Sequence, residues 1–416
     1  MKNYSVNRRQ MLKATSLTAL SALANPTFAI TSANVEKRYQ QTAKVPTTQS
    51  ELCFTPAVDL VQLIRTKKIS TREVMKAHVA QIARVNSKVN PLITLVPEDQ
   101  LMKEALAADE AIVKGKPLGA LHGLPIAVKD LAETKGLRTT FGSPIFRDNV
   151  PQQDALFVER QRKAGAIIIG KSNVPEFGMG SQTFNPIFGP SFNPYDITKT
   201  CGGSTGGGAA ALACGMVPLA DGTDMAGSLR NPGSFNNVVG LRPSPGRVPA
   251  ATSRLAWMTL SVAGPMARTV SDCALLLSVQ AGPDKRSPLS IMESPDQFAK
   301  PLQRSMKGVK VAFIKDLGPP WEQEVMDNFI PQQKVFESLG CIVEEAEPDM
   351  ADANECFMQL RHWQYEGQYG EHLETNGDKM NDYVKWHIAE GRKLTGPYLS
   401  RVETKRCAVS SHADVP

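Results

Sequence analysis

The alternation of hydrophobic and polar residues predicts a long amphipathic helix early in the chain and two buried strands after it. Ser70 and Glu73 have the spacing of a capping box, which marks the start of a helix. The apolar residues that follow on one helical face are Met75, Val79, Ile82 and Val85. LPIAVKD at 124–130 and GAIIIGKSN at 165–173 are short apolar runs that end in a lysine and a turn. Both runs predict buried strands.

A second alternation lies in the last quarter of the chain. GVKVAFIKD at 308–316 predicts a strand, residues 322–339 a helix, and GCIVEEAEP at 340–348 another strand. Strands that alternate with helices favour a largely parallel or mixed sheet with helices on both faces. The expected fold class is α/β, a single domain with a central mixed sheet flanked by helices. The final run, CAVSSHADVP, has no apolar period, so no closing strand or helix is expected there.

Composition indicates a globular chain rather than a disordered one. Of its 416 residues, 42% are hydrophobic and 21% are charged, which is enough for a large core. The net charge of +6 invites a nucleic-acid function, but four cations and no acid lie in residues 1–29. Without that segment the net charge falls to +2, so no basic face remains to argue for nucleic acid.

Residues 1–29 have the pattern of a bacterial twin-arginine export signal, and an ordinary basic tail is the alternative. Arg8 and Arg9 precede a modest apolar stretch, and small residues stand around Phe28, where a signal peptidase cuts. Polar residues interrupt the stretch, so stable membrane insertion is not expected. We therefore expect a signal peptide at 1–29, a linker at 30–52, a domain at 53–416, and a periplasmic or secreted mature protein.

The seven cysteines are scattered, with no C-x-x-C pair and no spacing typical of a metal site. Most are expected to be small buried hydrophobic residues. The chain also has no H-E-x-x-H motif or clustered metal ligands. We expect no metal and no organic cofactor.

The segment CGGSTGGGAAALACGMVPLADGTDMAGSLRNP, at 201–232, is the strongest candidate for chemistry. A P-loop needs a lysine after its glycines, and none follows here. No serine lies three residues before a lysine, which excludes the S-x-x-K pattern. Residues 202–206 match the G-x-S-x-G elbow of α/β-hydrolases, but no apolar strand runs into Ser204. A serine activated by a lysine remains, with an esterase that uses Ser204 as the alternative.

This segment resembles the signature of the amidase signature family. GLPIAVKD, GKSNVPEFG, FNPYD and GPMARTVSDCALLL fit the same family, and the resemblance covers about residues 55–407. It implies an amidase whose acylated serine is Ser228, whose bridging serine is Ser204 and whose lysine is Lys129. The two serines are 24 residues apart, which is the family's spacing. It also implies a cis peptide bond before Ser204 and an oxyanion hole made by the backbone N–H groups of Met225, Ala226, Gly227 and Ser228.

Several features depart from the family's pattern. Thr205 and Gly208 stand where serines are usual, and the Thr205 hydroxyl is expected to hydrogen-bond near Ser228. Ala226 replaces a glycine, so a positive φ at this position would strain the oxyanion hole. Family members also continue past the end of this chain, which implies missing C-terminal strands. A catalytically impaired member of the family is therefore a further alternative.

The implied mechanism needs an uncharged lysine. A serine hydroxyl is a weak nucleophile and must lose its proton during attack on an amide. A free lysine has a pKa of about 10.4 and is charged, but burial disfavours the charged form and lowers the pKa by several units. Lys129 ends an apolar strand, where burial is expected. Ser204 would then relay the proton of Ser228 to Lys129.

The expected partner is a small-molecule amide. A homodimer is compatible with the sequence. A component of a tRNA-dependent amidotransferase also uses this family's domain, but it works in the cytoplasm, and the export signal argues against it.

Overall fold

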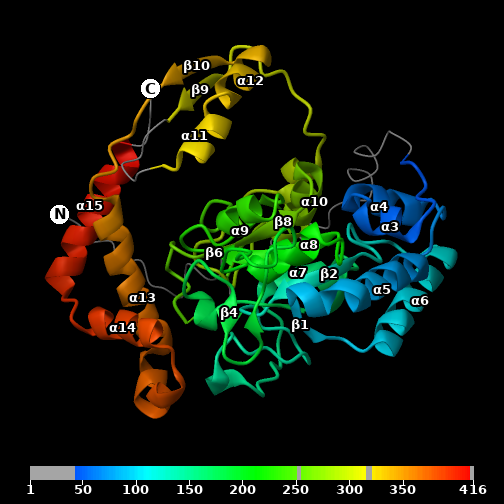
Figure 1. The fold of residues 1–416 in the computed structure, drawn as a ribbon, viewed down its shortest axis with the longest axis horizontal. Helices are drawn as coiled ribbons and strands as arrows, with labels where there is room; N and C mark the ends of the chain where they lie inside the picture. The colour runs from blue at the N-terminus through cyan, green and yellow to red at the C-terminus, as the bar shows by residue number, and fades with distance from the viewer. Residues whose placement is uncertain (1–42, 251–253, 315–320, 413–416) are drawn as a thin grey trace, which may run out of the picture.

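A six-stranded mixed sheet forms the centre of the described residues, which are 43–250, 254–314 and 321–412 of a computed structural model (Figure 1). The strand order is β1–β3–β2–β6–β8–β7. The strands are β1 (Leu92–Leu95), β2 (Pro125–Lys129), β3 (Ile167–Ser172), β6 (Leu219–Asp224), β7 (Val239–Gly240) and β8 (Val262–Ala267). β3, β2 and β6 run parallel, and β1, β8 and β7 are antiparallel to their neighbours. The strands predicted at 124–130 and 165–173 are β2 and β3, so both predictions are confirmed.

Helices cover both faces of this sheet, as predicted. One face packs against α4 (Ala57–Arg65), α7 (Leu156–Lys163) and α10 (Val270–Gln280). The other packs against α5 (Thr71–Val89), α6 (Glu98–Val113) and α8 (Gly206–Ala213). In β2, Ile126 and Val128 join the first core and Ala127 joins the second. Because strand side chains alternate between faces, Lys129 lies on the same face as Ala127, toward α8.

The predicted capping box is present at the start of α5. Glu73 N–H donates to the Ser70 hydroxyl at 3.1 Å, and Ser70 N–H donates to the Glu73 carboxylate at 2.7 Å. These bonds satisfy two backbone N–H groups at the helix start. The helix prediction is therefore confirmed.

The start of the folded part differs from the prediction. α3 (Gln49–Phe54) begins inside the predicted linker 30–52, and the Thr48 side chain accepts a hydrogen bond from Glu51 N–H at the start of this helix. Helical structure thus begins before residue 53, because a local capping box outweighs the polar composition of this segment. The predicted signal peptide at 1–29 lies outside the described residues. No helix in the described ranges is long and apolar enough to cross a membrane.

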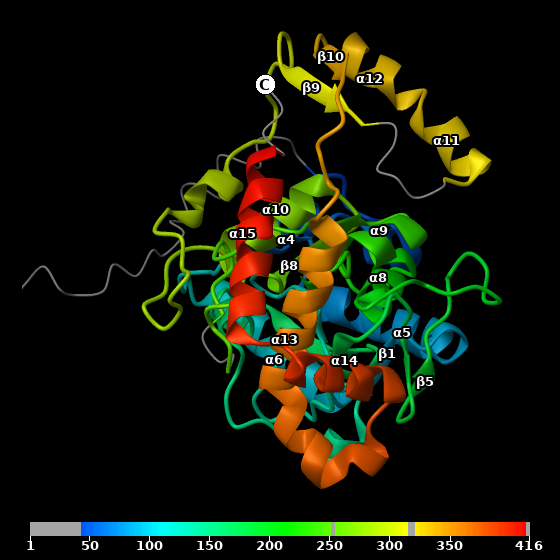
Figure 2. The ribbon, with the colours of Figure 1, turned by 90° about the vertical axis from the view of Figure 1, so that its left-hand side faces the viewer.

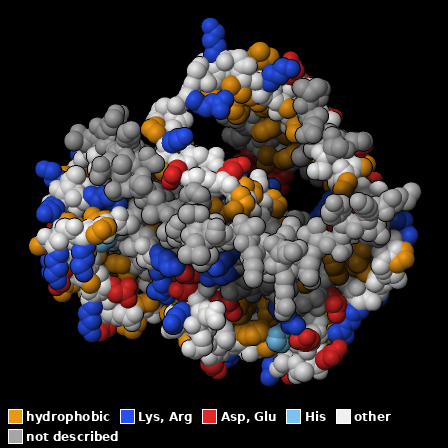
Figure 3. Space-filling view, turned by 180° about the vertical axis from the view of Figure 1, so that it is seen from behind, with side chains coloured by type: hydrophobic (Ala, Val, Ile, Leu, Met, Phe, Trp, Pro, Cys, Tyr) orange, Lys and Arg blue, Asp and Glu red, His pale blue; other side chains and the backbone are white. Residues whose placement is uncertain are grey.

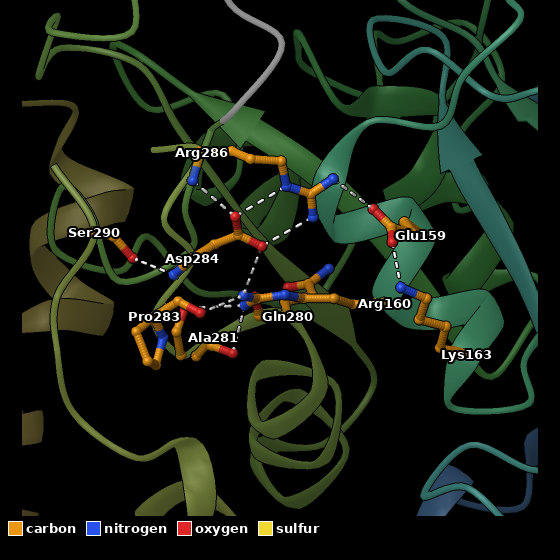
Figure 4. Close-up of polar contacts among 10 residues, drawn as sticks. Glu159, Arg160, Lys163, Gln280, Ala281, Pro283, Asp284, Arg286 and Ser290 are labelled. Carbon is orange, nitrogen blue, oxygen red and sulfur yellow. Dashed lines mark hydrogen bonds and ion pairs between the residues drawn. The ribbon is translucent and has the colours of Figure 1, made fainter. Parts of the chain in front are cut away.

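A single arginine ties α7 to the C-terminal end of α10 (Figure 4). The Arg160 guanidinium donates to the main-chain oxygens of Gln280, Ala281, Gly282 and Pro283 at 2.7 to 3.0 Å. The last carbonyls of a helix have no partner within the helix, and a cation also complements the negative end of the helix dipole. Arg160 therefore acts as a cap supplied by another element.

Short elements complete the body of the molecule. They are α9 (Arg230–Phe235), a hairpin of β4 (Phe184–Asn185) with β5 (Gly189–Pro190), and the 3-10 turns η1 (Pro144–Phe146), η2 (Glu176–Gly178), η3 (Pro295–Ala299) and η4 (Gly377–Lys379). Five of the seven cysteines are buried, as predicted: Cys53, Cys201, Cys273, Cys341 and Cys356.

Three helices near the end of the chain lie along one side of the body (Figures 1 and 2). They are α13 (Ala353–Asn376), α14 (Asp382–Arg392) and α15 (Gly396–His412). The residues CAVSSH, expected to lack a helix, form the last turns of α15. Buried Val402 of α15 packs with Cys356 and Leu360 of α13, so a tertiary contact supports a helix that lacks a clear apolar period.

The predicted strand–helix–strand unit of residues 308–348 exists, but it stands outside the central sheet. β9 (Lys310–Phe313) and β10 (Ile342–Glu345) pair in parallel as a separate two-stranded sheet. The single helix expected at 322–339 is two helices, α11 (Gln323–Phe329) and α12 (Gln332–Ser338). They separate at Pro331, which has no N–H to continue the helical bonds. We call residues 306–346 the lobe.

The lobe exposes many apolar side chains. Of its described residues, only Phe313 and Cys341 are buried. The large apolar residues exposed on it include Trp321, Val325, Phe329, Val335, Leu339 and Ile342. Figure 3 shows orange side chains on the lobe facing the hollow between it and the body. Two strands with two short helices provide too little apolar area for a core of their own.

Candidate active site

Lys129 reaches the glycine-rich turn from the end of β2. Its side chain is fully buried, and its Nζ is hydrogen-bonded to the hydroxyls of Ser204 and Thr205, both at 2.8 Å. It also contacts the Thr223 hydroxyl at 3.0 Å and the Thr223 carbonyl oxygen at 3.3 Å. The strand direction places the amine among oxygens contributed by two other segments. The predicted burial of Lys129 and its approach to Ser204 are therefore observed.

The environment of Lys129 favours its neutral form. Burial lowers the pKa of Lys129 to about 7, although the carboxylates of Asp224 and Asp221 act in the opposite direction. The ordinary pKa of a lysine is near 10.5. A neutral amine has two N–H donors, which suffice for Thr205 and Thr223, and one lone pair that can accept the Ser204 O–H. The site can thus hold a lysine that accepts a proton near neutral pH.

Ser204 lies in a tight turn that leads into α8. The peptide bond between Gly203 and Ser204 is cis, as the family resemblance implies. The Thr183 hydroxyl donates to the carbonyl oxygen of Gly202 at 2.7 Å and holds the turn from outside. A β-carbon at Gly207 would lie 2.3 Å from the Asn173 nitrogen, so α8 can pack this closely only with glycine there.

Ser228 lies in the loop between β6 and α9. The Thr205 N–H donates to the Ser228 carbonyl oxygen at 3.2 Å, so the two serine-bearing segments are hydrogen-bonded to each other. Within the described ranges, no hydrogen bond joins the Ser228 hydroxyl to Ser204. In the structure, Lys129 therefore contacts Ser204 directly through its side chain. The segment that carries Ser228 is joined to the segment of Ser204 through a backbone hydrogen bond.

Asp224, which the sequence reasoning missed, organises this loop. Its carboxylate accepts from the N–H groups of Gly227 and Leu229 at 2.9 and 3.1 Å, and from the side chains of Arg230 and Arg242. Burial opposes its charge, but the bonds from Arg230 and the two N–H groups outweigh burial and hold the pKa of Asp224 at about 2. A signal existed, because an Asp four residues before the serine and an Arg two residues after it belong to the same motif.

The predicted oxyanion hole needs one correction. The Gly227 N–H already donates to Asp224, so it is not directed at a substrate. Among the described residues, the N–H groups of Met225, Ala226 and Ser228 have no partner in the protein. These three are the donors that remain for a negatively charged oxygen beside Ser228.

Two further expectations concern the single residues Ala226 and Thr205. The positive φ lies at Gly227, at 102°, and not at Ala226, so the alanine does not strain the loop. The Thr205 hydroxyl contacts Lys129 and the Thr223 carbonyl oxygen instead of Ser228. Threonine at this position therefore stabilises the lysine side of the site.

The structure gives no support to the alternative of an esterase that uses Ser204. The residues before Ser204 form only an isolated bridge, Phe192 to Thr200, and no strand leads into the serine. The buried histidines His362 and His387 contact each other through their Nδ1 atoms at 2.9 Å.

In the part of the chain that the structure describes, no group of three or more His, Cys, Asp or Glu could hold a metal ion.

A buried lysine hydrogen-bonded to a serine in a glycine-rich turn, within a mixed α/β sheet, defines the class of serine–lysine sites. The Amidase family model matches residues 73–411. The chain belongs to the amidase signature family, as the sequence motifs predict.

Known relatives agree with this placement. The acylamidase of Rhodococcus erythropolis is 32% identical over 372 residues, which are 86% of this chain and 76% of that protein. A glutamyl-tRNA(Gln) amidotransferase subunit of Alkaliphilus metalliredigens is 40% identical over 289 residues, 69% of this chain. The match spans only 59% of the length of that amidotransferase subunit. The crystal structure of a bacterial aryl acylamidase of the same family has a TM-score of 0.81 at 27% identity, covering 87% of this chain and 77% of that one.

Proposed function

We propose that this protein hydrolyses a carboxylic amide through an acyl-enzyme on Ser228. The contact between the buried Lys129 amine and the Ser204 hydroxyl, at 2.8 Å, supports this function most directly. A base with a pKa of about 7 is suited to accept a proton at neutral pH. The similarity to an acylamidase and to an aryl acylamidase supports an amide as substrate.

In the proposed first half-reaction, the Ser228 oxygen forms a bond to the carbonyl carbon of the amide. Its proton passes to Ser204 while the proton of Ser204 passes to Lys129. The negative charge on the carbonyl oxygen is stabilised by the N–H groups of Met225, Ala226 and Ser228, and one such donor contributes about 3 to 4 kcal/mol. The carbon–nitrogen bond then breaks as Lys129 returns the proton, through Ser204, to the leaving nitrogen.

In the second half-reaction, water attacks the ester on Ser228. Its proton follows the same path to Lys129, and the Ser228 oxygen takes a proton back as the carboxylic acid leaves. All atoms are thus accounted for without a metal or organic cofactor.

Labelling with a fluorophosphonate tests this mechanism. The probe is expected to modify Ser228, located by mass spectrometry of the labelled peptide. Ser228→Ala is expected to abolish labelling, and Lys129→Ala to slow amide hydrolysis by at least a hundredfold, since general base catalysis contributes about that much. A label on Ser204 in the wild type would instead support the esterase alternative. A wild type that takes no label at all would indicate a catalytically impaired protein.

A second candidate is a component of an amidotransferase, because the 40% identity to the amidotransferase relative is higher than the identity to the acylamidase. The acylamidase match nevertheless covers more of this chain. Hydrolysis of a small amide by the isolated chain is expected under the first proposal. Activity that appears only with partner subunits would favour the second.

We also propose that the protein is exported, on the basis of the arginine pair and apolar stretch in residues 1–29. The mass of the protein isolated from its native cell is expected to lack these residues. Retention of the full segment in the mature protein would contradict export.

A further inference from the structure

The turn η2 lies close to the Ser204 side chain and has a strained backbone. In η2, Phe177 has a φ of 51° and Gly178 a φ of 72°, both in the left-handed region. Phenylalanine rarely adopts this conformation, because its β-carbon crowds the backbone. A β-carbon at Gly178 would lie 3.5 Å from the Ser204 hydroxyl oxygen, so the backbone of the turn closely approaches that serine.

The same turn is linked to the strand end that carries Lys129. The Phe177 N–H donates to the Phe141 carbonyl oxygen at 2.7 Å, and the Phe141 N–H donates to the Asp130 carbonyl oxygen at 3.1 Å. Phe141 is also left-handed, with a φ of 53°. Two strained phenylalanines therefore connect η2 to the residue after Lys129. Strain of this kind persists only where the surroundings impose it, and it is common at functional sites.

The hairpin of α13 and α14 supplies the contacts that impose it. The Tyr365 hydroxyl donates to the Phe177 carbonyl oxygen at 3.1 Å, in a buried position. The Tyr369 ring stacks on Phe177 with centroids 4.2 Å apart. The Glu176 carboxyl accepts from the Ser143 hydroxyl at 2.6 Å and from the backbone N–H of Asn381, at the start of α14, at 2.8 Å.

The hairpin also reaches the other half of the site. Buried residues of α13 and α14, among them Tyr365 and Val384, form one cluster with Phe177 and Met179 of the turn segment. Met225, the first residue of the loop that carries Ser228, packs against this cluster. One apolar unit thus touches both the backbone behind Ser204 and the loop of the proposed nucleophile.

The geometry points to Tyr365 and Glu176 as positioning residues that hold Ser204 in register with Ser228. This inference rests on the proposed function, and it assigns to α13–α14 a part in the alignment of the site. Packing alone would account for the contacts between rings. It would not require left-handed conformations at Phe177, in the turn that approaches the serine, and at Phe141, which is hydrogen-bonded to Phe177. The hydrogen bonds of this segment explain why these conformations are held.

The test compares labelling rates of the full chain and three variants. Tyr365→Phe removes the bond to Phe177. Glu176→Gln leaves one acceptor oxygen in place of two, so the side chain can no longer accept from both the Ser143 hydroxyl and the Asn381 N–H, which bind different oxygens in the wild type. Tyr398→Phe is the matched control, because its hydroxyl bonds to Glu355, away from the turn, at the same 3.1 Å. Each protein is titrated with the fluorophosphonate, and the labelled fraction, the limiting rate constant and the half-saturating probe concentration are measured.

Tyr365→Phe and Glu176→Gln are expected to lower the limiting rate constant about tenfold or more, with unchanged half-saturation, since small displacements of reacting groups have large effects on rate. Tyr398→Phe should stay within about twofold of wild type. A merely structural role would lower the labelled fraction but not the rate constant. If Tyr365→Phe does not fold, the limiting rate constant of Glu176→Gln alone tests the positioning role.

Two outcomes separate this inference from the proposed function. Wild-type labelling at Ser228 with variants at the wild-type rate constant would overturn the positioning role and leave the proposed function intact. A wild-type chain that is not labelled at Ser228 would overturn the proposed function, and the inference with it.

Discussion

At the scale of the residue, the environment of one amine determines what the site can do. Lys129 and Lys171 lie on neighbouring strands and are both fully buried, yet only Lys129 contacts the serine-bearing turn. Lys171 donates instead to the Ala132 carbonyl oxygen and the Thr134 hydroxyl. Burial lowers the pKa of both lysines, to about 7 and about 8 respectively. The pKa alone therefore does not single out the base, and the contact with Ser204 does.

The pH dependence of the reaction follows from the pKa of Lys129. Below about pH 7 the amine carries a proton and cannot accept another, so kcat/KM is expected to fall tenfold per pH unit there and to level off above it. Asp224, with a pKa of about 2, stays charged throughout this range and does not contribute. Rates of amide hydrolysis between pH 5 and 9 measure the profile.

The second lysine provides the control for this profile. A folded Lys171→Met variant should keep the loss of activity below pH 7, since Lys171 does not contact the serines. A wild-type profile that is flat between pH 6 and 8 would contradict the assignment of Lys129 as the base.

At the scale of the element, Arg160 shows how one side chain can secure a helix end. Its four hydrogen bonds to main-chain oxygens are partly shielded from water. Arg286, in the same region, pairs with Asp284 and Glu159 but is half exposed (Figure 4). Exposed ion pairs contribute little to stability, whereas buried hydrogen bonds from a charged group contribute more.

We therefore expect Arg160→Ala to lower the free energy of unfolding by about 2 to 3 kcal/mol, because it leaves the carbonyl oxygens after α10 without partners. Arg286→Ala should lower it by less than about 1 kcal/mol. Urea unfolding followed by circular dichroism measures both. Equal losses of unfolding free energy for the two variants would show that the helix cap stabilises the protein no more than the exposed ion pairs of Arg286 do.

At the scale of the whole molecule, the lobe and the central sheet differ in how much apolar surface they bury. β2 is buried along its whole length, whereas β9 and β10 each have exposed residues on a two-stranded sheet. Regions with few buried contacts open more readily than the core of the same protein.

Amide hydrogen exchange is expected to be faster in β9 and β10 than in β2 and β3, by at least a hundredfold, because the lobe can open without disturbing the central sheet. Exchange followed by mass spectrometry of peptides from the native chain measures this difference. Equal protection of the two sheets would mean that the lobe unfolds only together with the body.

How well the sequence predicts each feature depends on how far apart in the chain the interacting residues lie. α5, β2 and β3 were predictable because a capping box and short apolar runs are local signals. Pro331 is likewise a local signal, for the break between α11 and α12. The end of α15 could not be read from its own period, because its stability comes from contacts with α13. The hydrogen bond from Tyr365 to Phe177 had no sequence signal, since it joins residues 188 positions apart.

The sequence by itself determined the α/β class, the amphipathic helix and the buried strands, and its motifs pointed to the amidase signature family with Lys129, Ser204 and Ser228 as the candidate residues. Only the tertiary structure decided that Lys129 contacts Ser204, that the Asp224 carboxylate accepts a hydrogen bond from the Gly227 N–H, and that β9 and β10 form a sheet separate from the central one. The reason is physical. Local patterns depend on neighbours in the chain, whereas hydrogen bonds and burial depend on which distant segments the folded chain brings together.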